Sequence, residues 1–287
     1  MKRDANKTKF IWVSMGSMLL FYGAFFLFPM AYGLVGSFTN WNPYKGRFQF
    51  IGLNNYTRMF ADPLFFKSLL NTMSFTVVCV VLTTVIGLAL ALAVTSLKRF
   101  RSFLTTAIYM PYVTSIITIA VVWRWFYASQ GGLFNHVMSA FGISGLDWLT
   151  SAQTVWPSIA LMTIWHDVGY ALILFIAGIS EIPSTLFEAA AMDGAGRFAI
   201  FRKITIPILA PTTALVAVSG IITYVQVYDQ IVALTRGGPG DASFSVSYYL
   251  FDSAIGYQRF GYASAIAMVM LIIILFLSML QLRISQE

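Results

Sequence analysis

The sequence predicts an all-α membrane protein with six transmembrane helices. Three observations predict this class. Hydrophobic residues make up 58% of the chain and charged residues only 10%, whereas a soluble domain carries roughly 25% charged residues. Four stretches also contain no charged residue, and each exceeds the roughly 20 residues that a helix needs to cross the hydrocarbon core of a bilayer. These stretches are 10–44, 68–97, 102–123 and 260–282.

The first helix is expected to stay in the protein rather than be removed as a secretory signal. Its apolar run is longer than the roughly 7 to 15 residues of a signal core, and no small-x-small cleavage pattern follows it. The fourth and fifth helices each contain polar residues, His166 and Asp167 in the fourth and Asp229 at the end of the fifth. The six predicted helices are 10–36, 68–97, 102–127, 154–179, 205–229 and 260–283.

The basic residues predict the orientation of these helices. An even number of spans puts both termini on one side of the membrane, and most Lys and Arg fall in segments on that side. By the positive-inside rule, both termini are expected to be cytoplasmic. The inner residues are Lys2, Arg3, Lys7, Lys9, Lys98, Arg99, Arg101, Arg197, Arg202, Lys203 and Arg283, and the outer ones are Lys45, Arg47, Arg58, Lys67, Arg236 and Arg259.

The loops between the helices are too short to hold a separate soluble domain. We therefore expect a cytoplasmic N-terminal segment, 1–9, and one transmembrane domain, 10–287, whose longest inner loop is 180–206. The chain also lacks a phosphate-binding Gly-x-x-x-x-Gly-Lys-Ser/Thr loop, a His-x-x-x-His pair, a Cys-x-x-Cys pair and a Gly-x-Ser-x-Gly elbow. The sequence therefore predicts no catalytic residue, no metal ligand and no ATPase activity of its own.

The inner loop has the pattern of a helix, a break and a second short helix. Pro183 precedes the first helix, and Thr185 and Glu188 have the spacing of a capping box. Gly194 and Gly196 are expected to end that helix, and Pro207 to start the next membrane helix. Considered alone, the loop fits equally well as an amphipathic connector lying on the membrane surface.

The spacing within this loop resembles a signature of the permease subunits of binding-protein-dependent ABC importers. Glu188-Ala-Ala, then Gly194, then Ile204-x-x-Pro207 match it, while Ile206 stands where leucine is usual. The resemblance implies a coupling helix that sits in a cleft of an ATPase subunit. It assigns this coupling to Glu188, Ala189, Ala190, Asp193 and Gly194.

Two further motifs resemble the carbohydrate permeases of the maltose-transporter type. They are Leu234-Thr-x-Gly-Gly-Pro239 and Gly52-Leu-Asn-Asn-Tyr56. The resemblance implies the type I ABC importer fold and a multi-pass subunit of the bacterial cytoplasmic (inner) membrane. The implied partners are a second permease, two ATPase subunits that bind ATP and Mg²⁺, an extracytoplasmic binding protein and a sugar, which we expect to be of oligosaccharide size. No cofactor is expected on this chain, and the motifs do not say which sugar it carries.

Polar residues inside the membrane helices mark a candidate path for that substrate. On the fourth helix, Thr163, His166, Asp167 and Tyr170 share one face by their spacing. Such residues also mark membrane interfaces or join helices, so a purely structural role remains open for each. The resemblance implies that the sugar site is lined by Tyr112, Ile116, Thr163, His166, Asp167, Tyr170, Thr223, Tyr224 and Val227.

The competing interpretation is a proton-coupled secondary transporter that uses His166 and Asp167 as a relay. It would predict further acids inside the membrane and paired broken helices, and neither is visible in the sequence. A purely structural membrane scaffold would explain neither the long inner loop nor the polar stripe.

Overall fold

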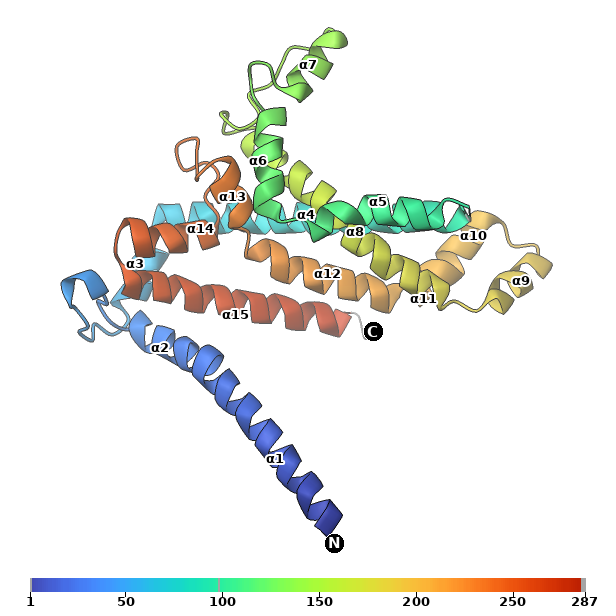
Figure 1. Ribbon diagram of the computed structural model, residues 1–287. Helices are drawn as coiled ribbons and strands as arrows, with labels where there is room; N and C mark the ends of the chain where they lie inside the picture. The colour runs from blue at the N-terminus through green and yellow to red at the C-terminus, as the bar shows by residue number, and fades with distance from the viewer. Residues whose placement is uncertain (1, 98, 285–287) are drawn as a thin grey trace. The chain divides into compact units, whose positions relative to one another are not determined.

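The computed structural model describes residues 2–97 and 99–284, and the regular secondary structure in this part of the chain is helical (Figure 1). Two isolated β-bridges, Thr39 with Phe50 and Asn42 with Arg47, close a short hairpin. The all-α class is confirmed. The chain forms two compact units, one of residues 1–63 and 250–271 and the other of residues 64–249 and 272–287. The predicted single transmembrane domain, 10–287, remains a prediction.

The first unit contains the N-terminal span and the start of the last helix. Its elements are α1 (Lys2–Tyr22), η1 (Gly23–Leu27), α2 (Phe28–Ser37), η2 (Pro43–Lys45), α3 (Asn54–Phe60), η4 (Asp252–Gly256) and the first half of α15 (Phe260–Ile284). Gly261 lets α15 begin directly against the hairpin, because a Cβ there would lie 2.1 Å from the Thr39 carbonyl oxygen. The Gly261 amide donates to the Trp41 carbonyl at 3.1 Å.

The second unit is built around α8 (Val155–Ser180). Around it lie α4 (Pro63–Ser96), α5 (Arg101–Val113), α6 (Ile116–Phe126) and α12 (Ala210–Val225). The shorter elements of this unit are α7 (Leu133–Ala140), α9 (Ser184–Met192), α10 (Arg197–Ile200), η3 (Phe201–Thr205), α11 (Ile206–Ile208), α13 (Asp229–Leu234) and most of α14 (Val246–Phe251). Small residues allow the close packing that membrane helices use. A Cβ at Gly87 of α4 would lie 2.6 Å from the Ala171 Cβ, and one at Gly169 would lie 2.5 Å from the Ile108 carbonyl oxygen of α5.

The membrane spans agree with the predicted number only when two bent helix pairs are each counted as one span. The described residues contain four single helices long and apolar enough to cross a membrane: Ile11–Ser37, Pro63–Ser96, Val155–Ser180 and Phe260–Leu280. The two bent pairs are Arg101–Val113 with Ile116–Phe126, and Arg197–Ile208 with Ala210–Val225. The predicted helices 10–36, 68–97, 154–179 and 260–283 therefore correspond to continuous spans.

The prediction of one continuous helix over 102–127 was wrong. The chain turns by 97° between α5 and α6, and Thr114 at the break is extended, with ψ of 144°. Pro111 lacks an amide hydrogen and so weakens the last turn of α5. The carbonyl freed at Thr114 finds a partner in His166 of α8, whose Nε2 lies 3.2 Å away, as backbone groups at membrane depth require.

The fifth predicted helix, 205–229, also differs from the structure. The helical path begins at Arg197, bends by 61° at Leu209 and continues as α12. Pro207 and Pro211 lie on either side of the bend and remove two amide donors from the ladder. The helix ends at Val225, and Asp229 opens the separate α13.

The inner loop forms the predicted helix, break and second helix, as α9 followed by α10. Gly194 ends α9 in the left-handed conformation, with φ of +74°. The amide of Ala195 donates to the Ala190 carbonyl, and that of Gly194 donates to Ala191, as in a Schellman cap. The predicted capping box was wrong, because α9 begins at Ser184 and so places Thr185 inside the helix.

Candidate functional site

A cavity of about 140 Å³ opens among α4, α5, α8 and α12 of the second unit. The four helices contribute hydroxyl groups, aromatic rings and one carboxylate to its wall. These residues are Val80, Thr83 and Thr84 from α4, Tyr112 from α5, Asp167, Tyr170 and Ala171 from α8, and Val216, Ser219, Gly220, Thr223 and Tyr224 from α12.

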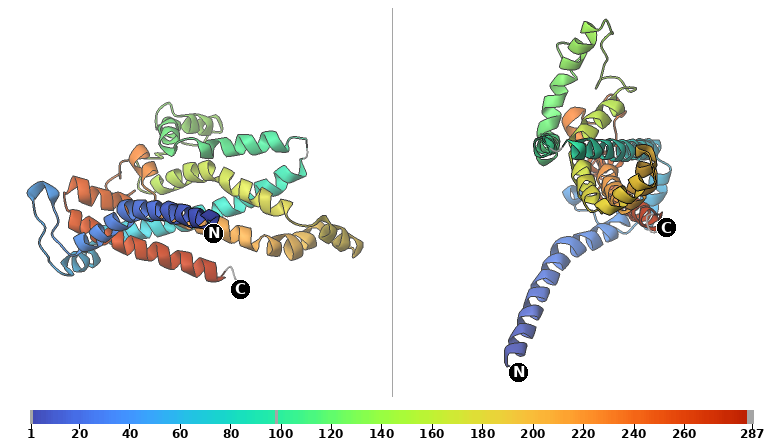
Figure 2. Two further views of the ribbon diagram at one scale, coloured as in Figure 1. Left: turned by 60° about the horizontal axis from the view of Figure 1, so that its bottom comes forward. Right: turned by 90° about the vertical axis from the view of Figure 1, so that its right-hand side faces the viewer.

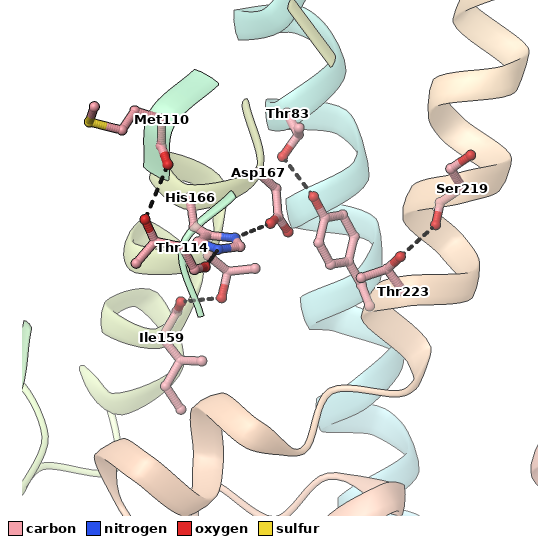
Figure 3. Close-up of polar contacts among 10 residues, drawn as sticks. Thr83, Met110, Thr114, Ile159, His166, Asp167, Ser219 and Thr223 are labelled. Atoms are coloured by element: carbon pink, nitrogen blue, oxygen red, sulfur yellow. Dashed lines mark hydrogen bonds and ion pairs between the residues drawn. The ribbon is translucent and has the colours of Figure 1, made fainter. Parts of the chain in front are cut away.

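Asp167 is held in this wall by His166, its neighbour on α8 (Figure 3). Nδ1 of His166 is hydrogen-bonded to the Asp167 carboxylate, and Nε2 lies 3.2 Å from the Thr114 carbonyl oxygen. Because a carbonyl only accepts, Nε2 must carry a hydrogen and donate it. His166 therefore connects the carboxylate to the break between α5 and α6.

The aromatic side chains of the cavity form two groups. The rings of Tyr112 and Tyr170 are stacked, with centroids 5.1 Å apart and planes at 22°. Tyr224 is almost fully buried, and its hydroxyl lies 3.1 Å from that of Thr83. The wall thus combines flat ring faces with hydrogen-bonding groups, which suits a ligand rich in hydroxyl groups.

The structure brings five of the nine predicted substrate residues to the cavity. They are Tyr112, Asp167, Tyr170, Thr223 and Tyr224. Four others lie outside its lining. Thr163 is fully buried and donates to the Ile159 carbonyl, Val227 is buried, Ile116 packs against the apolar core, and His166 acts through Asp167.

Sequence reasoning missed the contribution of α4 to the cavity. Thr83 and Thr84 form a polar pair within a long apolar run, and this pair is the signal that could have identified them. Ser219 was missed too, although it lies one helical turn before Thr223. Its backbone carbonyl accepts a hydrogen bond from the Thr223 hydroxyl at 2.9 Å.

The residues predicted to couple to an ATPase lie on α9 and its C-terminal cap. This helix projects beyond the ends of α8 and α12 in Figure 1 and in the left view of Figure 2. None of its residues is buried, and the side chain of Met192, its last residue, is 89% exposed. On the following helix α10, the side chain of Phe198 is 73% exposed. The arrangement leaves a helical surface free to bind another protein.

Apolar helices surround this cavity and α9 projects at one end of them, an arrangement that fits a membrane transport subunit. The profile of the family described as "Binding-protein-dependent transport system inner membrane component" matches residues 83–287. The chain therefore belongs to this family, whose members are multi-pass inner-membrane proteins of ABC transporters.

Individual relatives agree with this assignment. The chain is 34% identical over 263 residues to the probable ABC transporter permease protein YurN of Bacillus subtilis, covering 90% of each chain. It is 32% identical over 282 residues to the multiple sugar-binding transport system permease protein MsmF of Streptococcus mutans, covering 96% of this chain and 95% of that one. The predicted resemblance to carbohydrate permeases is confirmed.

Solved structures show the same fold. A chain of a bacterial ABC transporter involved in the import of the acidic polysaccharide alginate superposes with a TM-score of 0.88 at 22% identity, covering 99% of this chain and 97% of that one. A second alginate transporter structure, in complex with an alginate pentasaccharide-bound periplasmic protein, gives a TM-score of 0.85 at 23% identity, covering 99% and 98%. These two superpositions confirm the predicted type I importer fold.

The family match does not favour the proton-coupled alternative. One argument used against that alternative was nevertheless wrong, because the chain does contain two bent helix pairs. One of these bends, at Thr114, lies beside the cavity and contacts His166. A broken helix is therefore compatible with an ABC permease, and it positions part of the candidate site here.

Proposed function

We propose that this chain is the permease subunit of an ATP-driven importer and forms one wall of the path for a sugar, of oligosaccharide size, delivered by an extracytoplasmic binding protein. The observation that carries the proposal is the cavity that gathers Tyr112, Asp167, Tyr170, Thr223 and Tyr224. Several relatives support the substrate class by name, among them the multiple sugar permease MsmF. Aromatic faces can stack on sugar rings while the carboxylate and hydroxyls bind sugar hydroxyls.

The size of the cavity supports a heterodimer. Its volume of about 140 Å³ is below the roughly 300–1,000 Å³ of a typical ligand pocket. One chain therefore supplies only part of the surface that an oligosaccharide needs. A second permease subunit would supply the facing wall, so that the path lies between the two.

The free surface of α9 supports coupling to ATPase subunits that bind ATP and Mg²⁺. Ala189 and Ala190 allow close approach of a partner, and the exposed carboxylates of Glu188 and Asp193 can meet basic groups. Because α9 follows α8 after only Glu181, Ile182 and Pro183, a displacement of α9 would pull on the helix that carries Asp167. In this proposal α9 and both termini are cytoplasmic.

Uptake of radiolabelled sugar by cells that carry the complete transporter tests the proposed path. Asp167→Ala removes the only carboxylate of the cavity wall, so the initial uptake rate should fall by at least about tenfold, the loss expected for a buried charge-assisted hydrogen bond. Membrane abundance and co-purification with the partner subunits should not change.

Thr106→Val is the matched control, because Thr106 is exposed on α5 and its hydroxyl bonds only to its own helix, at the Ser102 carbonyl. Its uptake should equal that of the wild type. Normal uptake by Asp167→Ala, at normal abundance, would remove the cavity from the sugar path.

A further inference from the structure

The charge of the cavity wall bears on the class of sugar that could bind there. Asp167 is the only charged side chain among the residues that line the cavity, and no Lys or Arg is among them. The Asp167 side chain is 13% exposed, so its carboxylate is largely shielded from solvent. In such a low-dielectric setting, charge interactions are stronger than at a water-exposed surface.

His166 does not turn this wall into a cationic one. The imidazole is not among the lining residues, and both its ring nitrogens are engaged, by the Asp167 carboxylate and by the Thr114 carbonyl. In Figure 3 the carboxylate points toward Thr83 and α12, whereas the imidazole lies on the side of the broken helix. Because Nε2 donates to a carbonyl and Nδ1 is bonded to the carboxylate, the imidazole is protonated when Asp167 is ionised, so the pair carries no net positive charge and its negative member faces the cavity.

Thr84 adds a hydroxyl group that makes no hydrogen bond with the described residues. Its hydroxyl oxygen is buried and has no hydrogen-bond partner among the described residues, although the residue lines the cavity. Other threonines of α4 donate to the carbonyl four residues earlier, as Thr72, Thr76 and Thr95 do at 2.8 Å. A buried hydroxyl without a partner is unfavourable, and rotation about χ1 would turn it toward a group in the cavity.

We propose that this wall selects sugars without acid groups over acidic sugars, with Asp167 accepting a hydrogen bond from a sugar hydroxyl and Thr84 binding a second one. The inference rests on the proposed function of the cavity as the sugar path. A uronate or sulfonate would meet a carboxylate here and find no Lys or Arg among the residues that line the cavity. The similarity to a transporter of acidic alginate, at 22% identity, concerns the fold and leaves the charge of the cargo open.

Matched pairs of sugars test this selectivity on the complete transporter, purified with its partner subunits in nanodiscs and without the binding protein. The probes are maltotriose and cellotriose, each compared with the same trisaccharide oxidised to a glucuronate at C6 of its terminal ring. Saturation-transfer NMR titrations give the Kd of each sugar. The wild type should bind at least one neutral trisaccharide about tenfold more tightly than its uronate, as expected for like charges brought together at a buried site.

Two variants connect this preference to the named residues. Asp167→Asn keeps the shape and removes the charge, so the ratio of the two Kd values should shrink to about threefold or less, mainly through tighter binding of the uronate. Thr84→Val should raise the Kd of the neutral sugar by about three- to tenfold, and Thr84→Ser should restore it. Thr95→Val is the control on the same helix, away from the cavity lining.

Each result decides the question. Equal or tighter binding of the uronate by the wild type would overturn the selectivity while leaving the sugar path intact, and would indicate a cation supplied by the partner permease. An unchanged Kd for Thr84→Val would overturn the role of that hydroxyl. No binding of any of the four sugars would overturn both the selectivity and the proposed path.

Discussion

Gly169 occupies a point of α8 at which the neighbouring backbone leaves no room for a side chain. A Cβ there would lie 2.5 Å from the Ile108 carbonyl oxygen and 2.7 Å from the Tyr109 Cα. These backbone atoms cannot move aside as the end of a flexible side chain can. The distance between α5 and α8, and with it the stacking of Tyr112 on Tyr170, therefore depends on this single glycine.

Gly169→Val should destabilise the protein, because the added side chain must push α5 away from α8. Overpacking of this kind costs about 1–3 kcal/mol, and the melting temperature of the purified transporter should fall accordingly in a fluorescence-detected thermal scan. Gly16→Val is the control, since a Cβ at Gly16 has no atom within 4 Å. Equal melting temperatures for both variants would show that α5 tolerates the displacement.

Spacing along a helix predicts which residues share a face, but it does not predict which neighbours cover that face. Asp167 and Tyr170 were predicted from the spacing on α8 and do reach the cavity. Thr163 belongs to the same stripe, yet it is fully buried and its hydroxyl bonds to the Ile159 carbonyl. The packing of the neighbouring helices around α8 decides the difference, and the sequence of α8 alone contains no information about it.

Among the elements, α9 could be predicted closely and the bend between α5 and α6 could not. The limits of α9 are set by local chemistry, since Pro183 precedes it and Gly194 adopts a positive φ at its end. The bend depends on a partner 52 residues away, His166, which binds the carbonyl freed at Thr114. Thr114 and Ser115 therefore looked in the sequence like ordinary polar residues of one helix.

Glu188→Lys should weaken binding of the ATPase subunits, because it reverses a charge at the centre of the exposed α9. Gly194→Arg should do so as well, since Gly194 has φ of +74° and a side chain there strains the cap by roughly 1 kcal/mol or more. Co-purification of the ATPase and its turnover in proteoliposomes measure the effect, and both should fall while the permease remains in the membrane.

Glu181→Lys makes the same charge change just before α9, where Glu181 caps the C-terminus of α8. It should leave ATPase binding near the wild-type level. If Glu188→Lys and Gly194→Arg both bound the ATPase and transported normally, α9 would be a connector on the membrane surface, as the sequence alone also allowed.

For the whole molecule, composition and length predicted the membrane class and the approximate positions of the four single spans and the two bent helix pairs. Composition and length can be evaluated for each segment separately, because each helix must cover the hydrocarbon thickness with its own apolar side chains. They do not predict that two spans are bent, nor that the chain divides into two compact units. Those features depend on contacts between distant segments such as Thr114 and His166.

The orientation of the whole chain can be measured by labelling introduced cysteines. The sequence contains one cysteine, Cys79, which is buried, so a membrane-impermeant maleimide should not react with the unmodified protein. Met192→Cys and Phe50→Cys place thiols at side chains that are 89% and 80% exposed. In membranes that lack the ATPase subunits, Met192→Cys should be labelled in inverted vesicles and Phe50→Cys in spheroplasts.

This result would place α9 and both termini in the cytoplasm, as the distribution of Lys and Arg predicts, because an even number of spans keeps the two ends together. A Cys79→Ala background verifies that the signal comes from the introduced thiol. Labelling of Met192→Cys in spheroplasts would show that the chain has the opposite orientation in the membrane. The exposed surface of α9 would then face away from any cytoplasmic ATPase, and the proposed coupling would be untenable.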